Sequence, residues 1–162
     1  MDMTPSAPAD LLHVAGRLVL AVALGGAIGF NRELRQKPAG LRTHSLVALS
    51  AALLTVTGTL MAGGAGAVGD SATLGRVVQG MLAGIGFIGG GVILRRNDQR
   101  GVHGLTTAAG VWLVAAVGIA VGAGLWAAGA MAIALTLLVL AVGGMVDQRV
   151  HDSEKPGDSV QR

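Results

Sequence analysis

The sequence predicts an all-α membrane protein, a bundle of about five glycine-rich transmembrane helices. Hydrophobic residues make up 52% of the 162-residue chain and charged residues only 13%, which is about half the charged share of an average soluble domain. The charges also gather between long apolar runs instead of being spread through them. So few charged residues cannot cover a water-facing surface, and we therefore expect the chain to lie in lipid.

Each expected helix is a segment with little or no charge that is long enough to cross a bilayer, which takes about 20 apolar residues. Residues 11–30 contain one charge, Arg17, and residues 45–69, 77–94 and 104–146 contain none. The last run is long enough for two spans, and the glycines of "VGAGLW" (residues 121–126) favour a turn between them. Buried strands would need more turn signals and more β-branched or aromatic residues. The expected helices are therefore 11–31, 44–63, 73–95, 105–121 and 125–146.

Basic residues occur mainly in two of the loops and predict the orientation. They are Arg32, Arg35, Lys37 and Arg42 in the first loop, and Arg95, Arg96 and Arg100 in the third. The positive-inside rule places both loops in the cytoplasm, with the N-terminus outside and the C-terminus inside. The expected organisation is a periplasmic segment (1–10), a transmembrane domain (11–146) and a polar, disordered cytoplasmic tail (147–162). No basic n-region precedes Arg17, so we expect the first helix to be retained.

The stretch "GIGFIGGG" (residues 84–91) contains the spacing G-x-G-x-x-G, but it lies inside an uncharged run with no strand-like segment before it. A dinucleotide-binding loop needs that strand, so we do not predict a nucleotide site. In lipid, glycines four residues apart instead let helix backbones approach. Such pairs predict a tight bundle with the helix at 73–95 near its centre, and some of their faces could serve a homodimer. The pairs are Gly25 and Gly29, Gly80 and Gly84, Gly86 and Gly90, and Gly118 and Gly122.

Three polar residues allow two interpretations each. Arg17 either extends to the outer surface or forms a buried charge paired within the bundle. Asp70 either caps the third helix, near Arg76 and Gln79, or is an outward-facing cation ligand. Glu33 opposes the dipole at the end of the first helix, and it either forms an ion pair that organises the loop, with Lys37 for example, or binds a cation.

Other residues suggest capping, anchoring or packing roles. Thr43 is a candidate cap for the second helix, and Thr106 and Thr107 are candidate caps for the fourth. Trp126 suits an aromatic anchor at the outer interface, whereas Trp112 lies deeper and is expected to pack inside.

No feature of the sequence indicates catalysis. Cysteine is absent, the four histidines form no zinc-binding pattern, and no nucleophile–base set is visible. We therefore expect no enzyme and no cofactor, with Mg²⁺ as the one ion to consider, as ligand or transported species, at Asp70 or Glu33. Aromatic residues make up only 2% of the chain, which argues against nucleic-acid binding, whereas the basic loops suit anionic lipids.

Three blocks of the sequence resemble the MgtC/SapB family of bacterial membrane proteins: "GAIGFNRELRQKPAGLRTHSLVAL" (26–49), "RVVQGMLAGIGFIGGGVILRR" (76–96) and "GLTTAAGVWLVAAVGIAVGAGLW" (104–126). The resemblance implies a five-helix domain in the inner membrane, a role in magnesium homeostasis and growth at low magnesium, and, in pathogens, survival inside host cells. The residues it carries over are Arg32, Glu33, Lys37, Pro38, Gly40, Leu41, Arg42, Thr43, Asp70, Gln79, Gly84, Gly86, Gly89, Gly91, Thr106, Thr107 and Trp112.

Two functions fit these features best. The first is a regulatory module that binds another membrane protein, such as a transporter or the ATP synthase, through its glycine-rich faces. The second is a Mg²⁺ transporter or channel formed by an oligomer. A lipid or small-anion binder that uses the basic loops is a third. Better-known members of the family carry a C-terminal cytoplasmic domain that is not expected in this chain, so functions that depend on that domain are not expected either.

Overall fold

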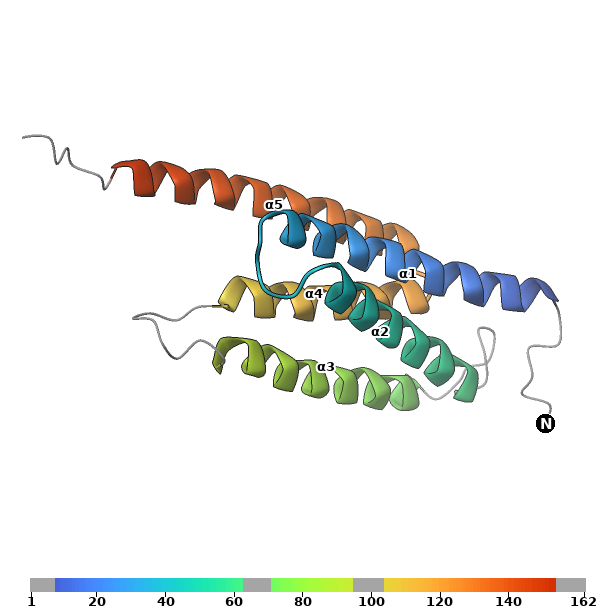
Figure 1. The fold of residues 1–162 in the computed structure, drawn as a ribbon. Coiled ribbons are helices and arrows are strands. Elements are labelled where there is room, and N and C mark those ends of the chain that lie inside the picture. The colour runs from blue at the N-terminus through green and yellow to red at the C-terminus, as the bar shows by residue number, and fades with distance from the viewer. Residues whose placement is uncertain (1–7, 63–70, 95–103, 154–162) are drawn as a thin grey trace, which may run out of the picture.

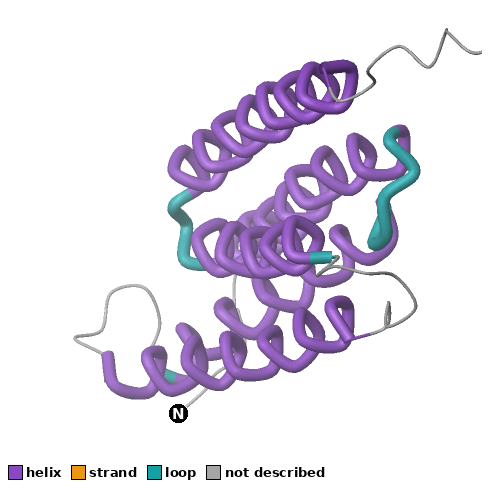
Figure 2. The backbone as a smooth tube through the Cα atoms, turned by 90° about the vertical axis from the view of Figure 1, so that its left-hand side faces the viewer, coloured by secondary structure: helices purple, strands orange, loops and turns teal. Residues whose placement is uncertain are grey.

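Five α-helices make up the structure, a computed structural model that describes residues 8–62, 71–94 and 104–153. They are α1 (Pro8–Leu34), α2 (Leu41–Met61), α3 (Ser71–Leu94), α4 (Leu105–Gly122) and α5 (Trp126–Ser153). Each contains a segment long and apolar enough to cross a membrane, and the described residues form no strand (Figure 2). The prediction of an all-α protein with five membrane-spanning helices is confirmed.

The observed helix bounds differ from the expected ones. The first helix is three residues longer at each end (8–34 against 11–31), and the differences at α2 and α5 have a physical reason. The second helix begins at Leu41 and not at residue 44, because a side chain from α1 caps it there, as described below. The last helix continues to Ser153, although a disordered tail was expected from residue 147. Residues 147–149 include Gln148 and Arg149, which are good helix formers, so the helix extends beyond its apolar segment. The turn expected within 121–126 is confirmed between α4 and α5.

Successive helices run in opposite directions, with α3 and α5 on opposite sides of the bundle (Figures 1 and 2). Within the apolar spans, 44% of the residues of α2 and of α4 are buried, against 6% for α3. The expectation that the helix at 73–95 lies near the centre was therefore wrong. A Cβ atom at Gly80, Gly84, Gly86 or Gly90 would have no atom within 4 Å to meet, apart from its own helix backbone and adjacent residues, so these glycines bring no helix of this chain close to α3.

The centre of the bundle is α2, which lies between α1 and α4. On the α1 side, a Cβ atom at Gly25 would lie 2.7 Å from the Cβ atom of Ala48. On the α4 side, a Cβ atom at Gly118 would clash with the carbonyl oxygen of Ala48 and lie 2.9 Å from the Cβ atom of Ala51. Glycine on α1 and α4 faces alanine on α2. The three backbones approach so closely that larger side chains do not fit between them.

A second glycine on each of α1 and α4, one turn further along its own helix, also lies against α2 or the residue before it. A Cβ atom at Gly29 would lie 2.7 Å from the Cα atom of Leu41, and one at Gly122 would lie 2.7 Å from the carbonyl oxygen of Ala52. Both glycine pairs that the sequence placed on the first and fourth helices therefore lie against α2. The apolar core extends from this contact and includes Ala21, Ile28, Ala48, Ala52, Val114, Val117, Val121 and Ile133.

Candidate functional site

A buried arginine connects the end of α1 to the start of α4. Arg32 lies in the last turn of α1 and is only 5% exposed. Its Nη2 atom donates a hydrogen bond to Oγ1 of Thr107, which is also buried. Burying a guanidinium is costly unless its hydrogen bonds are satisfied. The position of Arg32 therefore depends on the first turn of α4.

A buried histidine lies against the same face of α4. His44, in the first turn of α2, is fully buried, and its Nδ1 atom donates to the carbonyl oxygen of Gly40 over 3.0 Å. Its other nitrogen, Nε2, would lie 3.4 Å from a Cβ atom at Gly110. Because Gly110 follows Thr107 by three residues, the two positions are neighbours on one face of α4. We call Arg32, His44 and Thr107, together with half-buried Asn31 next to Arg32 on α1, the buried polar cluster.

Three atoms of this cluster are buried without a hydrogen-bond partner in the part of the chain that the structure describes. They are Oδ1 of Asn31, Nε of Arg32 and Nε2 of His44. Such atoms are rare in native proteins, since each costs about 1–3 kcal/mol, and they often mark a functional role or a bound water or ion. The concentration of three at one end of the bundle makes the buried polar cluster the candidate functional site.

The chemistry of the cluster suits water or an anion better than a metal ion. Arg32 offers a positive charge and a free N–H donor, while His44, with its proton on Nδ1, offers Nε2 as an acceptor. Mg²⁺ prefers several oxygen ligands, usually with a carboxylate among them. The cluster contains no carboxylate. Among the described residues, no group of three His, Cys, Asp or Glu side chains could hold a metal ion.

Glu33, one of the two predicted metal ligands, caps a helix. Its Oε2 atom accepts a hydrogen bond of 2.9 Å from the backbone N–H of Leu41, at the start of α2. The carboxylate lies so close to Gly40 that a Cβ atom there would be 2.7 Å from Oε2. The cap expected from Thr43 is therefore wrong, because the helix begins earlier and α2 has no side-chain cap at its own N-cap residue.

The loop between α1 and α2 is folded tightly enough to bring Glu33 to Leu41. The backbone N–H groups of Gln36 and Lys37 donate to the carbonyl oxygens of Glu33 and Arg32. With Gln36 at a φ of 51°, this pattern is a Schellman motif that ends α1. The motif turns the chain back, so that the cap and the buried polar cluster lie at the same end of the bundle, which we call the basic end.

Arg17 is half-buried and bonds to the backbone of another helix, so neither of its two interpretations describes it in full. Its Nη1 atom donates a 3.0 Å hydrogen bond to the carbonyl oxygen of Gly122, at the end of α4. Gly124 in the following turn has a φ of 91°, and a Cβ atom there would lie 3.3 Å from Nη2 of Arg17. Arg17 thus satisfies a helix-terminal carbonyl at the end of the bundle opposite the basic end.

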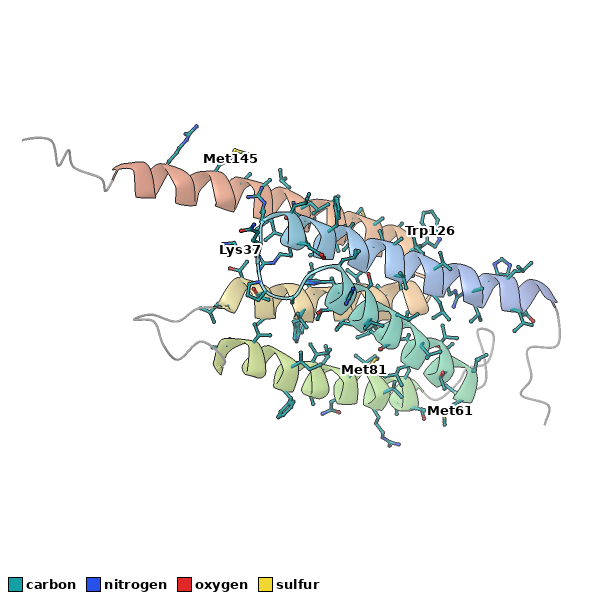
Figure 3. All side chains as sticks on the ribbon, viewed as in Figure 1. Lys37, Met61, Met81, Trp126 and Met145 are labelled. Carbon is teal, nitrogen blue, oxygen red and sulfur yellow. The ribbon has the colours of Figure 1, made fainter. Side chains whose placement is uncertain are left out.

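The other predicted residues are not part of the cluster. Four of them are exposed: Lys37 (Figure 3), Arg42, Gln79 and Thr106. Trp112 is 48% exposed, so the expectation that it packs inside was wrong. Trp126 begins α5 and is 65% exposed, as an interfacial anchor would be. The caps expected from Thr106 and Thr107 are absent, because Gly104 precedes α4 without a side-chain cap. Asp70, Arg95 and Arg96 lie outside the described residues.

Two members of the cluster, Asn31 and His44, were not predicted as site residues. His44 was set aside because no zinc-binding spacing surrounds it. A different signal was available: His44 and Asn31 are polar residues at the ends of apolar segments, next to residues already singled out. Grouping Asn31 and His44 into one site would have required knowing that the end of α1 and the start of α2 lie against the same face of α4.

Comparison with known proteins identifies the family of this chain. The MgtC family model matches residues 18–149. Protein SrpB of Synechococcus elongatus is 41% identical over 138 residues, which is 82% of this chain and 75% of SrpB. Protein MgtC of Brucella abortus is 44% identical over 109 residues, 67% of this chain and 42% of that protein. The "Putative magnesium transporter YhiD" of Escherichia coli is 42% identical over 129 residues, 78% of this chain and 58% of YhiD.

The chain thus spans about half the length of the MgtC and YhiD relatives and a larger part of SrpB. No solved structure matches it. The matched residues include all five membrane-spanning segments except the first turns of α1. The chain is a multi-pass protein of the bacterial inner membrane and belongs to the MgtC family.

Proposed function

We propose that this chain is a regulatory membrane module of magnesium homeostasis and low-magnesium adaptation, which acts on another membrane protein and is not an enzyme. Its family and the names of its relatives support the link to magnesium. The observation that carries the regulatory interpretation is the charge of the candidate site. Among the buried polar residues of the described part of the chain, the cation is Arg32, and the hydrogen bond of its Nη2 atom goes to Thr107 and not to a carboxylate.

The acidic residues argue against an ion path through a single chain. On α1 to α4 the acids are Asp10 and Glu33, near the two ends of α1. Glu33 is already bonded to the α2 backbone, and Arg32 beside it repels divalent cations, most strongly where water is excluded. A Mg²⁺ ion that entered the bundle would meet a positive charge and few oxygen ligands.

The surface offers places for a regulated partner. The α3 helix is mostly exposed and packs less closely than α1, α2 and α4. Lys37 and Arg42 are exposed at the basic end, where they suit anionic lipids or acidic groups of another protein. A transporter or the ATP synthase is the kind of partner that the family resemblance suggests.

The alternative function is a Mg²⁺ transporter or channel formed by an oligomer. The printed name of the YhiD relative favours it. In such an assembly, Glu33 or Asp70 from several copies would form a ring around a shared axis. This function requires the carboxylate charge itself, whereas a helix cap requires only an oxygen acceptor.

The two functions can be separated with the purified chain in liposomes that contain a Mg²⁺-sensitive dye. The regulatory function predicts no flux above that of empty liposomes, together with rescue of growth at low magnesium when the gene is restored to a deletion strain of its own host. Flux that disappears in Glu33→Gln or Asp70→Asn would establish transport instead. Restored growth in both variants, without flux, would support regulation, because both retain an oxygen acceptor but lose the charge.

A further inference from the structure

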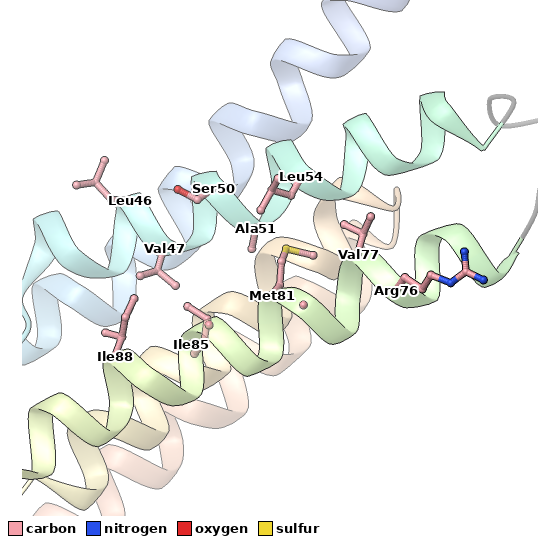
Figure 4. A pocket seen from close by; sticks show the side chains of 12 residues that line it. Leu46, Val47, Ser50, Ala51, Leu54, Arg76, Val77, Met81, Ile85 and Ile88 are labelled. Carbon is pink, nitrogen blue, oxygen red and sulfur yellow. The ribbon is translucent and has the colours of Figure 1, made fainter.

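A groove runs along the surface of the bundle between α2 and α3 (Figure 4). Its volume is about 640 Å³, within the range of small-molecule binding sites. The two polar residues in its lining are Ser50 and Arg76, and the others are Leu46, Val47, Ala51, Leu54, Val77, Gly80, Met81, Gly84, Ile85 and Ile88. The groove therefore combines an apolar channel with a single positive charge.

The glycines of α3 keep the groove open. A Cβ atom at Gly80 or at Gly84 would meet no neighbouring atom within 4 Å, so space remains beside both residues. The two helices come close at Gly58, where a Cβ atom would lie 3.4 Å from Cγ2 of Val77. Arg76 precedes Val77, so the charge lies at the end of the groove where α2 and α3 meet.

We propose that this groove holds one acyl chain of a phospholipid whose phosphate is bound by Arg76. The groove lining on α3 extends from Arg76 to Ile88, which corresponds to about 18 Å of helix at 1.5 Å per residue. One leaflet contributes about half of the roughly 30 Å hydrocarbon core. The groove therefore matches the depth of one leaflet, with its cation at the end opposite the basic end (Figure 4).

The distribution of charge favours a lipid over a second copy of the chain. An arginine at the headgroup end of an otherwise apolar groove complements a phosphate, which guanidinium binds through paired hydrogen bonds. An acyl chain is flexible and already part of the surrounding solvent, so it fills an irregular groove without exposing polar groups. This proposal goes beyond the regulatory function and does not depend on it, since a transporter could hold the same lipid.

A photoreactive lipid tests the proposal on the full chain. Phosphatidylglycerol with a diazirine in one acyl chain is mixed into liposomes of unlabelled phosphatidylcholine that contain the protein, and the labelled residues are mapped by mass spectrometry. We expect labels on the groove residues of α2 and α3. Arg76→Gln should reduce this labelling roughly tenfold, as expected for one lost charge-assisted hydrogen bond, and Gly80→Leu with Gly84→Leu should abolish it by filling the groove.

Two matched controls separate the groove from general effects. Gly90→Leu with Gly91→Leu adds the same two leucines to α3 at other open positions, outside the groove lining, and should leave the labelling unchanged. A photoreactive diacylglycerol, which lacks the phosphate, should label the groove weakly and equally in the Arg76→Gln variant. Uniform labelling over all lipid-facing helices would overturn the proposal. So would a dimer that the Gly80→Leu and Gly84→Leu substitutions dissociate, because a second copy would then be the occupant.

Discussion

Glycine pairs of identical spacing occur on α1 and α4 and also on α3, but their surroundings differ. Gly25, Gly29, Gly118 and Gly122 lie against α2 so closely that a Cβ atom would meet another atom within 3 Å. Gly80, Gly84, Gly86 and Gly90 meet nothing within 4 Å. The spacing of glycines therefore does not determine whether a helix packs closely. Close packing also depends on the residues of the helix that faces the glycines.

The difference lies in the residues that face each pair. The central contact places glycine on α1 and α4 opposite Ala48, Ala51 and Ala52 of α2, so small residues occupy both sides. Where α3 faces α2, the residues of α2 that line the groove include Leu46 and Leu54, which are larger than alanine. Helix association in lipid depends on close dispersion contact. No atom of another helix fills the space beside Gly80 and Gly84, and this space belongs to the groove.

The largest expected loss of stability comes from a substitution that disrupts the close contact between α2 and α4. Gly118→Leu should lower the free energy of unfolding by about 3 kcal/mol, the upper part of the range for an overpacked core, because even its Cβ atom would clash with Ala48. Gly84→Leu, the same change on α3, should cost less than about 0.5 kcal/mol. Reversible unfolding in detergent micelles measures both. Equal losses would show that α3 is packed as closely as the centre.

A smaller loss is expected from the hydrogen bond that joins α1 to α4. Thr107→Val keeps the shape of the side chain but removes the acceptor of Arg32, which leaves a buried guanidinium N–H unpaired and should cost about 2 kcal/mol. Thr106→Val is the matched control, since Thr106 is adjacent and exposed. The same unfolding measurement applies. A Thr107→Val protein as stable as the control would mean that Arg32 does not need this partner.

The fold was predictable because lipid imposes strict demands on composition. Four long runs with at most one charge each, the last of them long enough for two spans, leave little choice of secondary structure, and the turn after α4 follows from its glycines. The position of each helix in the bundle was not predictable in this way. It depends on which side chains face each other, as α3 illustrates, and a single sequence does not show which faces meet.

The candidate site was predictable only in part. Arg32 and Thr107 were singled out, but as separate residues with different roles, because they lie on helices far apart in the sequence. His44 was overlooked, since its significance comes from burial against α4 and not from a motif. Glu33 was considered as a member of an ion pair or as a cation ligand. Its role as a cap for another helix follows from the tight loop, whose αL residues, Gln36 and Ala39, are not glycines.

The cap supplied by Glu33 provides a third test, at the junction of α1 and α2. Glu33→Ala removes the acceptor for the Leu41 N–H and should cost about 1 kcal/mol, as the loss of an N-cap does. Glu33→Gln retains an oxygen acceptor and should cost less than half as much. Thermal unfolding of the two variants side by side measures the difference. Similar losses in both would indicate that the negative charge matters and not the hydrogen bond.

The smallest change in the free energy of unfolding is expected on α3. Its sign distinguishes the glycines of α3 from those that lie against α2. Glycine within a helix is less stable than alanine by about 0.5–1 kcal/mol, because the unfolded chain has more freedom to lose. At Gly84 an added methyl group meets nothing, so Gly84→Ala should stabilise the protein by up to about 0.5 kcal/mol. Gly25→Ala makes the same change where a methyl group would lie 2.7 Å from Ala48, and there the steric cost should outweigh the gain.

Opposite signs for one chemical change, measured as free energies of unfolding, would show that the space beside α3 is real. A loss of stability in Gly84→Ala would place a neighbour against that glycine in the folded protein, and the groove would then be closed.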